Sequence, residues 1–201
     1  MKVNLNSISN RAQSFLKNPS FYKAGLLSDF VVTVDGNDKI LTAFHGKNAD
    51  DVDFIIASVL AKFSENRKIL DIWKINFREI ESFLRDENHL PAFTENIPEL
   101  EQILNSNKIS LVGSAVKAKL GTEAENLFSL RENWNQLSLA AKNQWAQKLS
   151  AALGWELILC EDEVLTVTST PSGVDEAGLS ILISTVLSGA ETLPPMKVVA
   201  V

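Results

Sequence analysis

The sequence predicts an α+β fold, in which an N-terminal antiparallel sheet packed by helices is followed by a smaller α+β unit. Three observations indicate this class. Two β-branched runs flank a glycine and asparagine turn within residues 30–45, and apolar residues then recur with helical spacing from Val52 to Phe63. A second pair of strand-like runs lies between two helical patterns after Ser138. The 201 residues are enough for two units that each bury a core.

The composition is that of a globular protein, with 45% hydrophobic and 22% charged residues. The net charge of −6 argues against general nucleic-acid binding, which requires a basic surface. No segment approaches the roughly 20 apolar residues of a membrane span, and the first residues lack an apolar signal-peptide core. We therefore expect a soluble cytoplasmic protein that binds neither nucleic acid nor membrane. Its single cysteine, Cys160, allows no internal disulfide.

The first half of the chain begins with an amphipathic pattern from Ile8 to Lys17, which predicts a short helix that Pro19 ends. Residues 30–35 and 39–45 form the predicted hairpin, because glycine and asparagine between them tolerate a tight turn. A helix is expected from Asp50 to Ser64, with aspartates at the N-terminal end that the helix dipole favours.

Residues 75–93 carry the clearest local signals in the chain. Asn76 and Glu79 have the spacing of a capping box, so each side chain can bind a backbone N–H of the first helical turn. Apolar residues then recur at helical spacing and predict a helix from Ile75 to Asp86 that is docked on a core. The expected buried stripe consists of Phe77, Ile80 and Leu84, with Phe83 beside it.

The remaining elements divide the chain into an N-terminal helical extension (1–21), an α+β domain (22–104) and a C-terminal α+β domain of unknown family (105–201). The domain boundary is placed near Asn105, in a polar stretch between two apolar segments. The helices expected around and after it are Ile97–Leu104, Leu111–Leu120, Leu139–Leu153, which Ser138 can cap, and Val174–Leu187. The strands expected in the second half are Trp155–Cys160 and Val164–Ser169.

Several short motifs mark the loops of the first half. Leu27-Ser28-Asp29 precedes the first strand, Phe44-His45-Gly46-Lys47 closes the hairpin, and Arg85-Asp86 is followed after four residues by Pro91-Ala92-Phe93. In these motifs and in the order of its elements, the segment 22–104 resembles the NifU N-terminal or IscU-like domain, which is a scaffold for iron–sulfur cluster assembly. The form of the last motif looks most like divergent NifU-like proteins.

The same resemblance shows where the cluster ligands are missing. Leu27 and Lys47 stand where the family has its first two ligand cysteines, and neither its histidine nor its third cysteine follows Pro91. Asp29 alone remains of the ligand motif. Because iron–sulfur clusters need thiolate ligands, the resemblance implies a degenerate scaffold that no longer holds a cluster. We expect no cofactor.

Asp29, His45 and His89 form the alternative, a site of two histidines and one carboxylate for a metal ion. The resemblance implies that their loops lie near one end of the sheet. The competing interpretation is that both histidines are exposed loop residues and that Asp29 is solvated or accepts hydrogen bonds in a turn.

Two further groups of residues have a possible chemical role and a structural one. Asp86 and Glu87 beside His89 suit an acid–base cluster, but this helix end is also typical of a solvated turn in which Arg85 pairs locally. Cys160 ends an apolar strand, where a cysteine usually packs as a small hydrophobe, and the acidic residues after it disfavour a thiolate.

Three tryptophans of the second half, Trp134, Trp145 and Trp155, suit a core or, as the alternative, an exposed binding surface. The chain contains no nucleotide-binding, hydrolase or zinc-binding motif. The leading hypothesis is therefore a non-enzymatic binding or adaptor protein that contacts a protein partner or self-associates. The alternative hypothesis is a metal-dependent or iron–sulfur-assembly-related protein that uses Asp29, His45 and His89.

Overall fold

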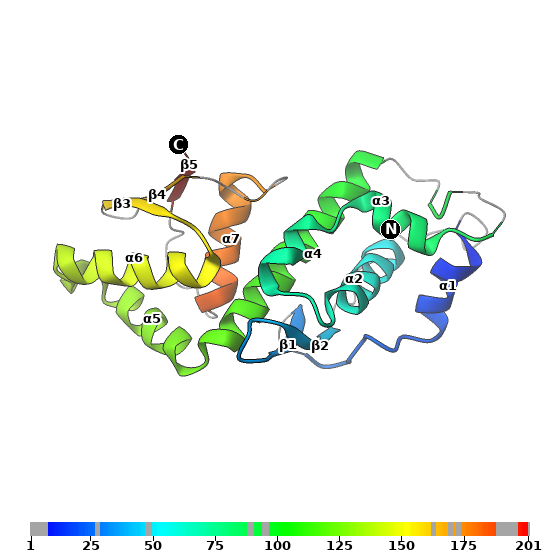
Figure 1. Ribbon diagram of the computed structural model, residues 1–201, viewed down its shortest axis with the longest axis horizontal. Coiled ribbons are helices and arrows are strands. Elements are labelled where there is room, and N and C mark those ends of the chain that lie inside the picture. Colours follow the sequence, from blue (N-terminus) through cyan, green and yellow to red (C-terminus); the bar gives the residue numbers. More distant parts are fainter. Residues whose placement is uncertain are drawn as a thin grey trace. The chain divides into compact units, whose positions relative to one another are not determined.

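The computed structural model confirms the α+β class, with a small antiparallel sheet followed by helices and a second small sheet (Figure 1). The chain divides into two compact units, Met1–Leu111 (unit 1) and Val112–Val201 (unit 2), which are described separately. The structure describes residues 8–26, 29–46, 50–87, 91–93, 97–161, 164–168, 171, 174–187 and 197–200.

Most elements follow the expected order. Unit 1 contains α1 (Asn10–Lys17), β1 (Phe30–Val34), β2 (Ile40–His45), α2 (Asp51–Ser64), the 3-10 helix η2 (Ile69–Lys74), α3 (Phe77–Leu84) and the first part of α4 (Ile97–Leu120). Unit 2 contains the rest of α4, α5 (Thr122–Glu132), the 3-10 helix η3 (Trp134–Gln136), α6 (Leu139–Leu153), β3 (Leu157–Glu161), β4 (Val164–Val167), α7 (Glu176–Leu187) and β5 (Lys197–Ala200). None of the described helices combines the length and apolar composition that a membrane crossing requires.

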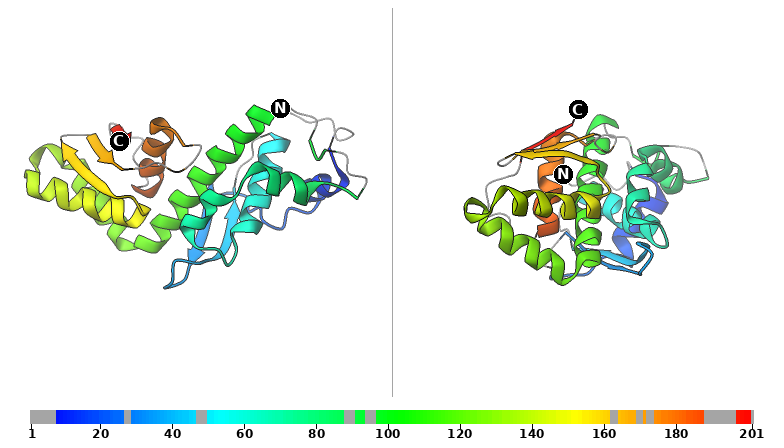
Figure 2. Two further views of the ribbon diagram at one scale, coloured as in Figure 1. Left: turned by 45° about the horizontal axis from the view of Figure 1, so that its top comes forward. Right: turned by 60° about the vertical axis from the view of Figure 1, so that its left-hand side comes forward.

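The predicted hairpin is confirmed. Strands β1 and β2 pair antiparallel from Phe30 opposite His45 to Thr33 opposite Thr42, and Asp35 closes the turn by accepting hydrogen bonds from the N–H groups of its neighbours. Alternate residues of β1 are buried, as the strand period requires. Helix α2 packs against β2 and covers the buried face, as Figures 1 and 2 both show.

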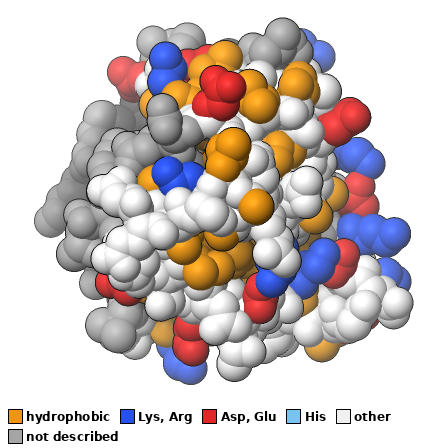
Figure 3. Space-filling view, turned by 90° about the vertical axis from the view of Figure 1, so that its left-hand side faces the viewer, with side chains coloured by type: hydrophobic (Ala, Val, Ile, Leu, Met, Phe, Trp, Pro, Cys, Tyr) orange, Lys and Arg blue, Asp and Glu red, His pale blue; other side chains and the backbone are white. Residues whose placement is uncertain are grey.

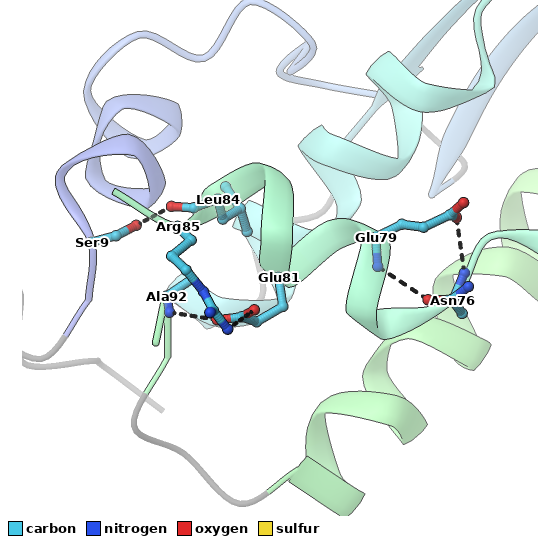
Figure 4. Close-up of polar contacts among 7 residues, drawn as sticks. All are labelled: Ser9, Asn76, Glu79, Glu81, Leu84, Arg85 and Ala92. Carbon is cyan, nitrogen blue, oxygen red and sulfur yellow. Dashed lines mark hydrogen bonds and ion pairs between the residues drawn. The ribbon is translucent and has the colours of Figure 1, made fainter. Parts of the chain in front are cut away.

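Helix α3 also forms as predicted, two residues shorter at each end. The Asn76 side chain accepts from the Glu79 N–H at 3.0 Å, and the Glu79 carboxylate accepts from the Asn76 N–H at 3.3 Å (Figure 4). This capping box begins the helix. The expected stripe is buried, with Phe77 9%, Ile80 0% and Leu84 0% exposed.

Helix α4 departs from the prediction, because it runs without interruption over the polar stretch that was expected to separate two helices. Three of its polar side chains at this point, Asn107, Lys108 and Ser110, are buried and hydrogen-bonded within unit 1. Asn107 donates to the Asp53 carboxylate at 2.5 Å, and Ser110 donates to the Asp29 carboxylate at 2.9 Å. Lys108 is 5% exposed, and burial lowers the pKa of its ammonium, which Glu79 and Glu101 partly offset. Tertiary hydrogen bonds therefore accommodate polar residues in a buried helix.

Unit 2 has a three-stranded sheet in the order β3-β4-β5, in which β3 and β4 pair antiparallel and β5 lies parallel to β4. Helix α6 begins at the predicted cap, Ser138, and ends at Gly154 in the left-handed conformation. Trp134 and Trp145 lie in the core with their rings 5.1 Å apart, which confirms the core interpretation for these two tryptophans. Neither α5 nor the parallel strand β5 was predicted from the sequence.

Candidate functional site

Two helix ends meet where the chain enters α1 and leaves α3. The Ser9 hydroxyl donates to the Leu84 carbonyl at 2.5 Å, a contact shown in Figure 4, and it accepts from the Ala12 N–H at 3.0 Å. The Asp86 carboxylate accepts from the backbone N–H groups of Asn10 at 2.7 Å and of Arg11 at 3.1 Å. A negative side chain thus satisfies the donors at the positive end of α1, which holds α1 against α3.

The hydrogen bonds from Asn10 and Arg11 hold the pKa of Asp86 below its ordinary value. The carboxylate is therefore kept ionised by backbone donors, as a structural anchor requires. This contact supports the structural interpretation of the turn over the acid–base interpretation. His89, the third residue of the acid–base alternative, lies outside the described residues.

Arg85 and Glu81 form the second part of this junction. The Arg85 guanidinium binds both carboxylate oxygens of Glu81, at 3.2 and 2.5 Å, and the same carboxylate accepts from the Ala92 N–H at 3.0 Å (Figure 4). Burial alone would raise the pKa of Glu81, but the bonds from Arg85 and Ala92 outweigh burial and lower it. The motif Arg85-Asp86 followed by Pro91-Ala92 therefore has a structural role in joining α3 to its neighbours.

A group of aromatic rings and basic side chains surrounds this junction, and Phe83 lies at its centre. The Phe83 ring is 5.1 Å from that of Phe63 and 6.1 Å from that of Phe15. The Lys62 ammonium lies 4.8 Å and the Arg11 guanidinium 5.5 Å from the Phe83 centroid. We call this group the aromatic–basic surface; it consists of Arg11, Phe15, Lys62, Phe63, Arg67 and Phe83.

The cations of the aromatic–basic surface are held by rings and carbonyls. Arg11 donates to the Phe83 carbonyl at 2.7 Å, and the Arg67 guanidinium lies 5.8 Å from the Phe63 centroid. Within the described parts of the chain, Arg11, Lys62 and Arg67 form no ion pair with a carboxylate. Arg11 and Lys62 are exposed and the three rings are half-buried, so the surface presents both positive charge and aromatic carbon to solvent.

A hollow of about 230 Å³ adjoins the aromatic–basic surface between α1 and α2. Lys62 belongs to both features. Polar groups and aromatic rings share the lining, which consists of Ser14, Phe15, Asn18, Ser20, Phe21 and Lys62.

His45 lies in the core of unit 1, so the expectation of an exposed loop histidine is wrong for this residue. Its side chain is 0% exposed, and its Nε2 lies 2.7 Å from the Ser58 hydroxyl. The rings of Tyr22, Phe30 and Phe54 surround it at centroid distances of 5.5, 6.3 and 4.7 Å. The position is decided by β2, whose last residue faces α2.

Asp29 lies directly before β1 and accepts the hydrogen bond from Ser110 described above. Leu27, Lys47 and His89 are outside the described residues. The structure thus does not test whether the three expected metal ligands approach one another. Among the residues that it describes, no three His, Cys, Asp or Glu side chains are grouped as metal ligands, and the site of Asp29, His45 and His89 stays a prediction.

Unit 2 exposes apolar side chains at the sheet edge formed by β3. Ile158 is 55% and Leu159 45% exposed. The next residue, Cys160, is 1% exposed and packs as an apolar residue. Figure 3 faces this end of unit 2 and shows hydrophobic side chains bordered by charged ones. The register of β3 shifts between Leu157 and Leu159, and such an irregularity, followed by a charged residue, protects an edge from pairing. We therefore place the candidate site on unit 1.

The aromatic–basic surface was not predicted from the sequence. Its basic residues, Arg11, Lys62 and Arg67, come from separate segments of the chain, and no motif relates them. Phe83 was noted only as a neighbour of the buried stripe. No local pattern in the sequence predicts that a basic residue of α1 contacts the last turn of α3. That contact arises only when the two helices pack together.

Comparison with known proteins identifies no relative: no family model, no curated protein and no solved structure matches the chain. The resemblance of residues 22–104 to iron–sulfur scaffold domains therefore stays a hypothesis drawn from local motifs.

Proposed function

We propose that this chain is a non-enzymatic binding or adaptor protein of the cytoplasm, in which residues 22–104 keep a degenerate iron–sulfur scaffold-like fold that no longer holds a cluster. The single observation that carries the binding role is the aromatic–basic surface of unit 1. The partner is a second protein, or a second copy of this chain, that presents an acidic segment.

The chemistry of this surface suits protein recognition. Aromatic residues and arginine are enriched at the centres of protein interfaces, where rings supply contact area and guanidinium groups bind carboxylates. Here Arg11, Lys62 and Arg67 are positioned by rings, and within the described residues none of them forms an ion pair with a carboxylate, although Asp86 and Asp71 attract Arg11 and Arg67 at longer range. A chain with a net charge of −6 thus has a local cationic surface, which favours an acidic partner.

Two kinds of observation support the loss of cluster binding: the residues at the expected ligand positions and the contacts of the Arg85-Asp86 motif. Leu27 and Lys47 occupy positions where the resemblance implies cysteine ligands, and neither side chain is a thiolate. The hairpin followed by α2 and the short helix α3 agrees with the order of elements in the scaffold family. In the motif shared with divergent members, Asp86 joins α3 to α1 and Arg85 pairs with Glu81 of α3.

The binding role is tested by reversing one charge of the surface. Quantitative affinity capture from the native cells uses three baits: the wild type, Arg67→Glu and a matched control, Lys117→Glu. Lys117 is an exposed lysine of α4. We expect a protein that the wild type and Lys117→Glu capture equally and that Arg67→Glu captures at least about tenfold less, since a charged contact contributes roughly 1.5–3 kcal/mol. That protein is then purified and titrated calorimetrically against all three baits, and sedimentation velocity of the wild type tests for a second copy.

Two results would contradict the proposal. One is the absence of any captured protein or self-association that depends on Arg67. The other is stoichiometric iron and sulfide, or a micromolar zinc complex lost in His45→Ala or His89→Ala, because either result favours the metal-dependent or cluster-related alternative.

A further inference from the structure

We propose that the hollow beside the aromatic–basic surface binds a glutamate side chain of the partner's acidic segment, with Lys62 as the cation that receives its carboxylate. The inference rests on the proposed function and names the group that the partner presents.

The size of the hollow selects a side chain over a whole small molecule. Pockets for small-molecule ligands usually enclose about 300–1,000 Å³, whereas this hollow encloses about 230 Å³. A volume below that range suits a single anchoring residue, and such anchors typically fill pockets near the centre of an interface.

The lining matches the two parts of a glutamate side chain. Phe15 and Phe21 line the hollow and can pack against its methylene groups, and Ser20 and Lys62, which line it as well, carry side-chain donors that can bind its carboxylate. The Ser14 hydroxyl already donates to the Arg11 carbonyl at 2.6 Å, which leaves it to line the hollow rather than to bind an anion.

Lys62 is positioned before any partner binds. Its ammonium lies 4.8 Å from the Phe83 centroid, and within the described residues it has no carboxylate partner. A cation held by a ring loses less conformational freedom when it binds an anion than a lysine that extends freely into solvent. The Phe83 ring thus lowers the conformational entropy that Lys62 loses when it binds a carboxylate, and it adds no formal negative charge.

The partial negative charge at the C-terminus of α1 disfavours a carboxylate in the hollow, but this unfavourable interaction is small. Helix C-termini carry roughly half a negative charge, and Ser14, Phe15 and Asn18 belong to the last turn of α1 or its cap. The Asn18 N–H already binds the Ser14 carbonyl at 2.9 Å, and Lys17 adds a full positive charge to the same turn. The formal charge of Lys62 together with Lys17 therefore exceeds that of the helix end.

The inference is tested by nitrogen-15 NMR of the full chain titrated with two blocked peptides, Gly-Ser-Glu-Ser-Gly and Gly-Ser-Gln-Ser-Gly. We expect saturable shifts with the glutamate peptide at the amides of Ser14, Phe15, Ser20 and Phe21, and about tenfold weaker binding of the glutamine peptide, because it lacks the charge. Lys62→Gln should weaken binding of the glutamate peptide by a similar factor, while Lys62→Arg and the control Lys117→Gln should retain it. Backbone spectra of each variant verify that the fold is unchanged.

Equal binding of the two peptides, binding that is insensitive to Lys62→Gln, shifts that map elsewhere, or no saturable shift would overturn the inference. The two proposals fail separately. A captured partner that depends on Arg67 but binds Lys62→Gln as well as the wild type would leave the binding role intact and remove the glutamate site. Glutamate-peptide binding at Lys62 without any Arg67-dependent partner would support the glutamate site and contradict the proposed binding role.

Discussion

The carboxylate of Asp86 accepts a hydrogen bond of 2.7 Å from the backbone N–H of Asn10, which lies 76 positions earlier in the chain. A residue just beyond the end of α3 thus completes the first turn of α1. This contact, together with the bond from Ser9 to the Leu84 carbonyl, turns two short helices into one packed element of unit 1. Four predictions test how such contacts stabilise the two units.

Asp86→Asn should destabilise unit 1 at neutral pH, because the amide lacks the charge that favours the N-terminus of α1. The pKa of Asp86 is lowered in the folded protein from 3.8, so its stabilising contribution is present above that value and is lost as the pH falls through the lower folded pKa. The difference between wild type and variant should therefore shrink below about pH 4. Urea unfolding from pH 7 to pH 3 measures it.

The matched control for Asp86 is Glu87→Gln, since Glu87 is the next residue and is exposed. Its unfolding free energy should change by less than about 0.5 kcal/mol. A pH-independent difference between wild type and Asp86→Asn would show that the charge does not interact with α1.

Leu84→Ala should lower the unfolding free energy by about 2–5 kcal/mol, because Leu84 is 0% exposed and truncation leaves a cavity. Denaturant unfolding followed by circular dichroism provides the measurement. Ser82→Ala on the exposed side of the same helix is the control. If Leu84→Ala costs well under 1 kcal/mol, the stripe does not face a core.

Ser110→Ala should cost about 1.5–3 kcal/mol, since it removes a hydrogen bond to the Asp29 carboxylate from a residue that is 8% exposed. Ser106→Ala on the same helix is exposed and changes helix propensity equally, so the difference between the two variants in urea unfolding isolates the buried contact. Equal stability of the two variants would mean that the polar stretch of α4 is not held by tertiary hydrogen bonds.

Gly113→Ala should destabilise unit 2 by about 1–3 kcal/mol, because a β-carbon there would lie 2.6 Å from Cγ2 of Thr185 on α7. Thr185→Gly in the same chain should recover part of the loss by removing the atoms in the way. Gly36→Ala is the control, since a β-carbon at Gly36 would meet no atom within 4 Å and the φ of this residue is not left-handed. A thermal melt that is unchanged by Gly113→Ala would contradict the close approach of α4 and α7.

The sequence by itself determined the elements whose signals are local. The capping box of Asn76 and Glu79, the turn closed by Asp35 and the cap of α6 at Ser138 each involve residues at most four positions apart, so spacing alone revealed them. The helical period likewise predicted which residues of α3 are buried, because one face of a helix must pack against a core.

Only the tertiary structure decided the features that join distant segments. Asn107 and Ser110 have polar side chains of the kind that is typical of linkers. Helix α4 nevertheless continues through them, because the carboxylates of Asp53 and Asp29 accept hydrogen bonds from the Asn107 amide and the Ser110 hydroxyl. His45 is buried because Ser58 on α2 supplies a polar partner for its ring. Parallel pairing of β5 with β4 and the gathering of basic side chains around Phe83 also need contacts that no local spacing encodes. Such contacts depend on which surfaces the folded chain brings within hydrogen-bonding and van der Waals distance. Residues far apart in the sequence show no spacing pattern from which these distances can be predicted.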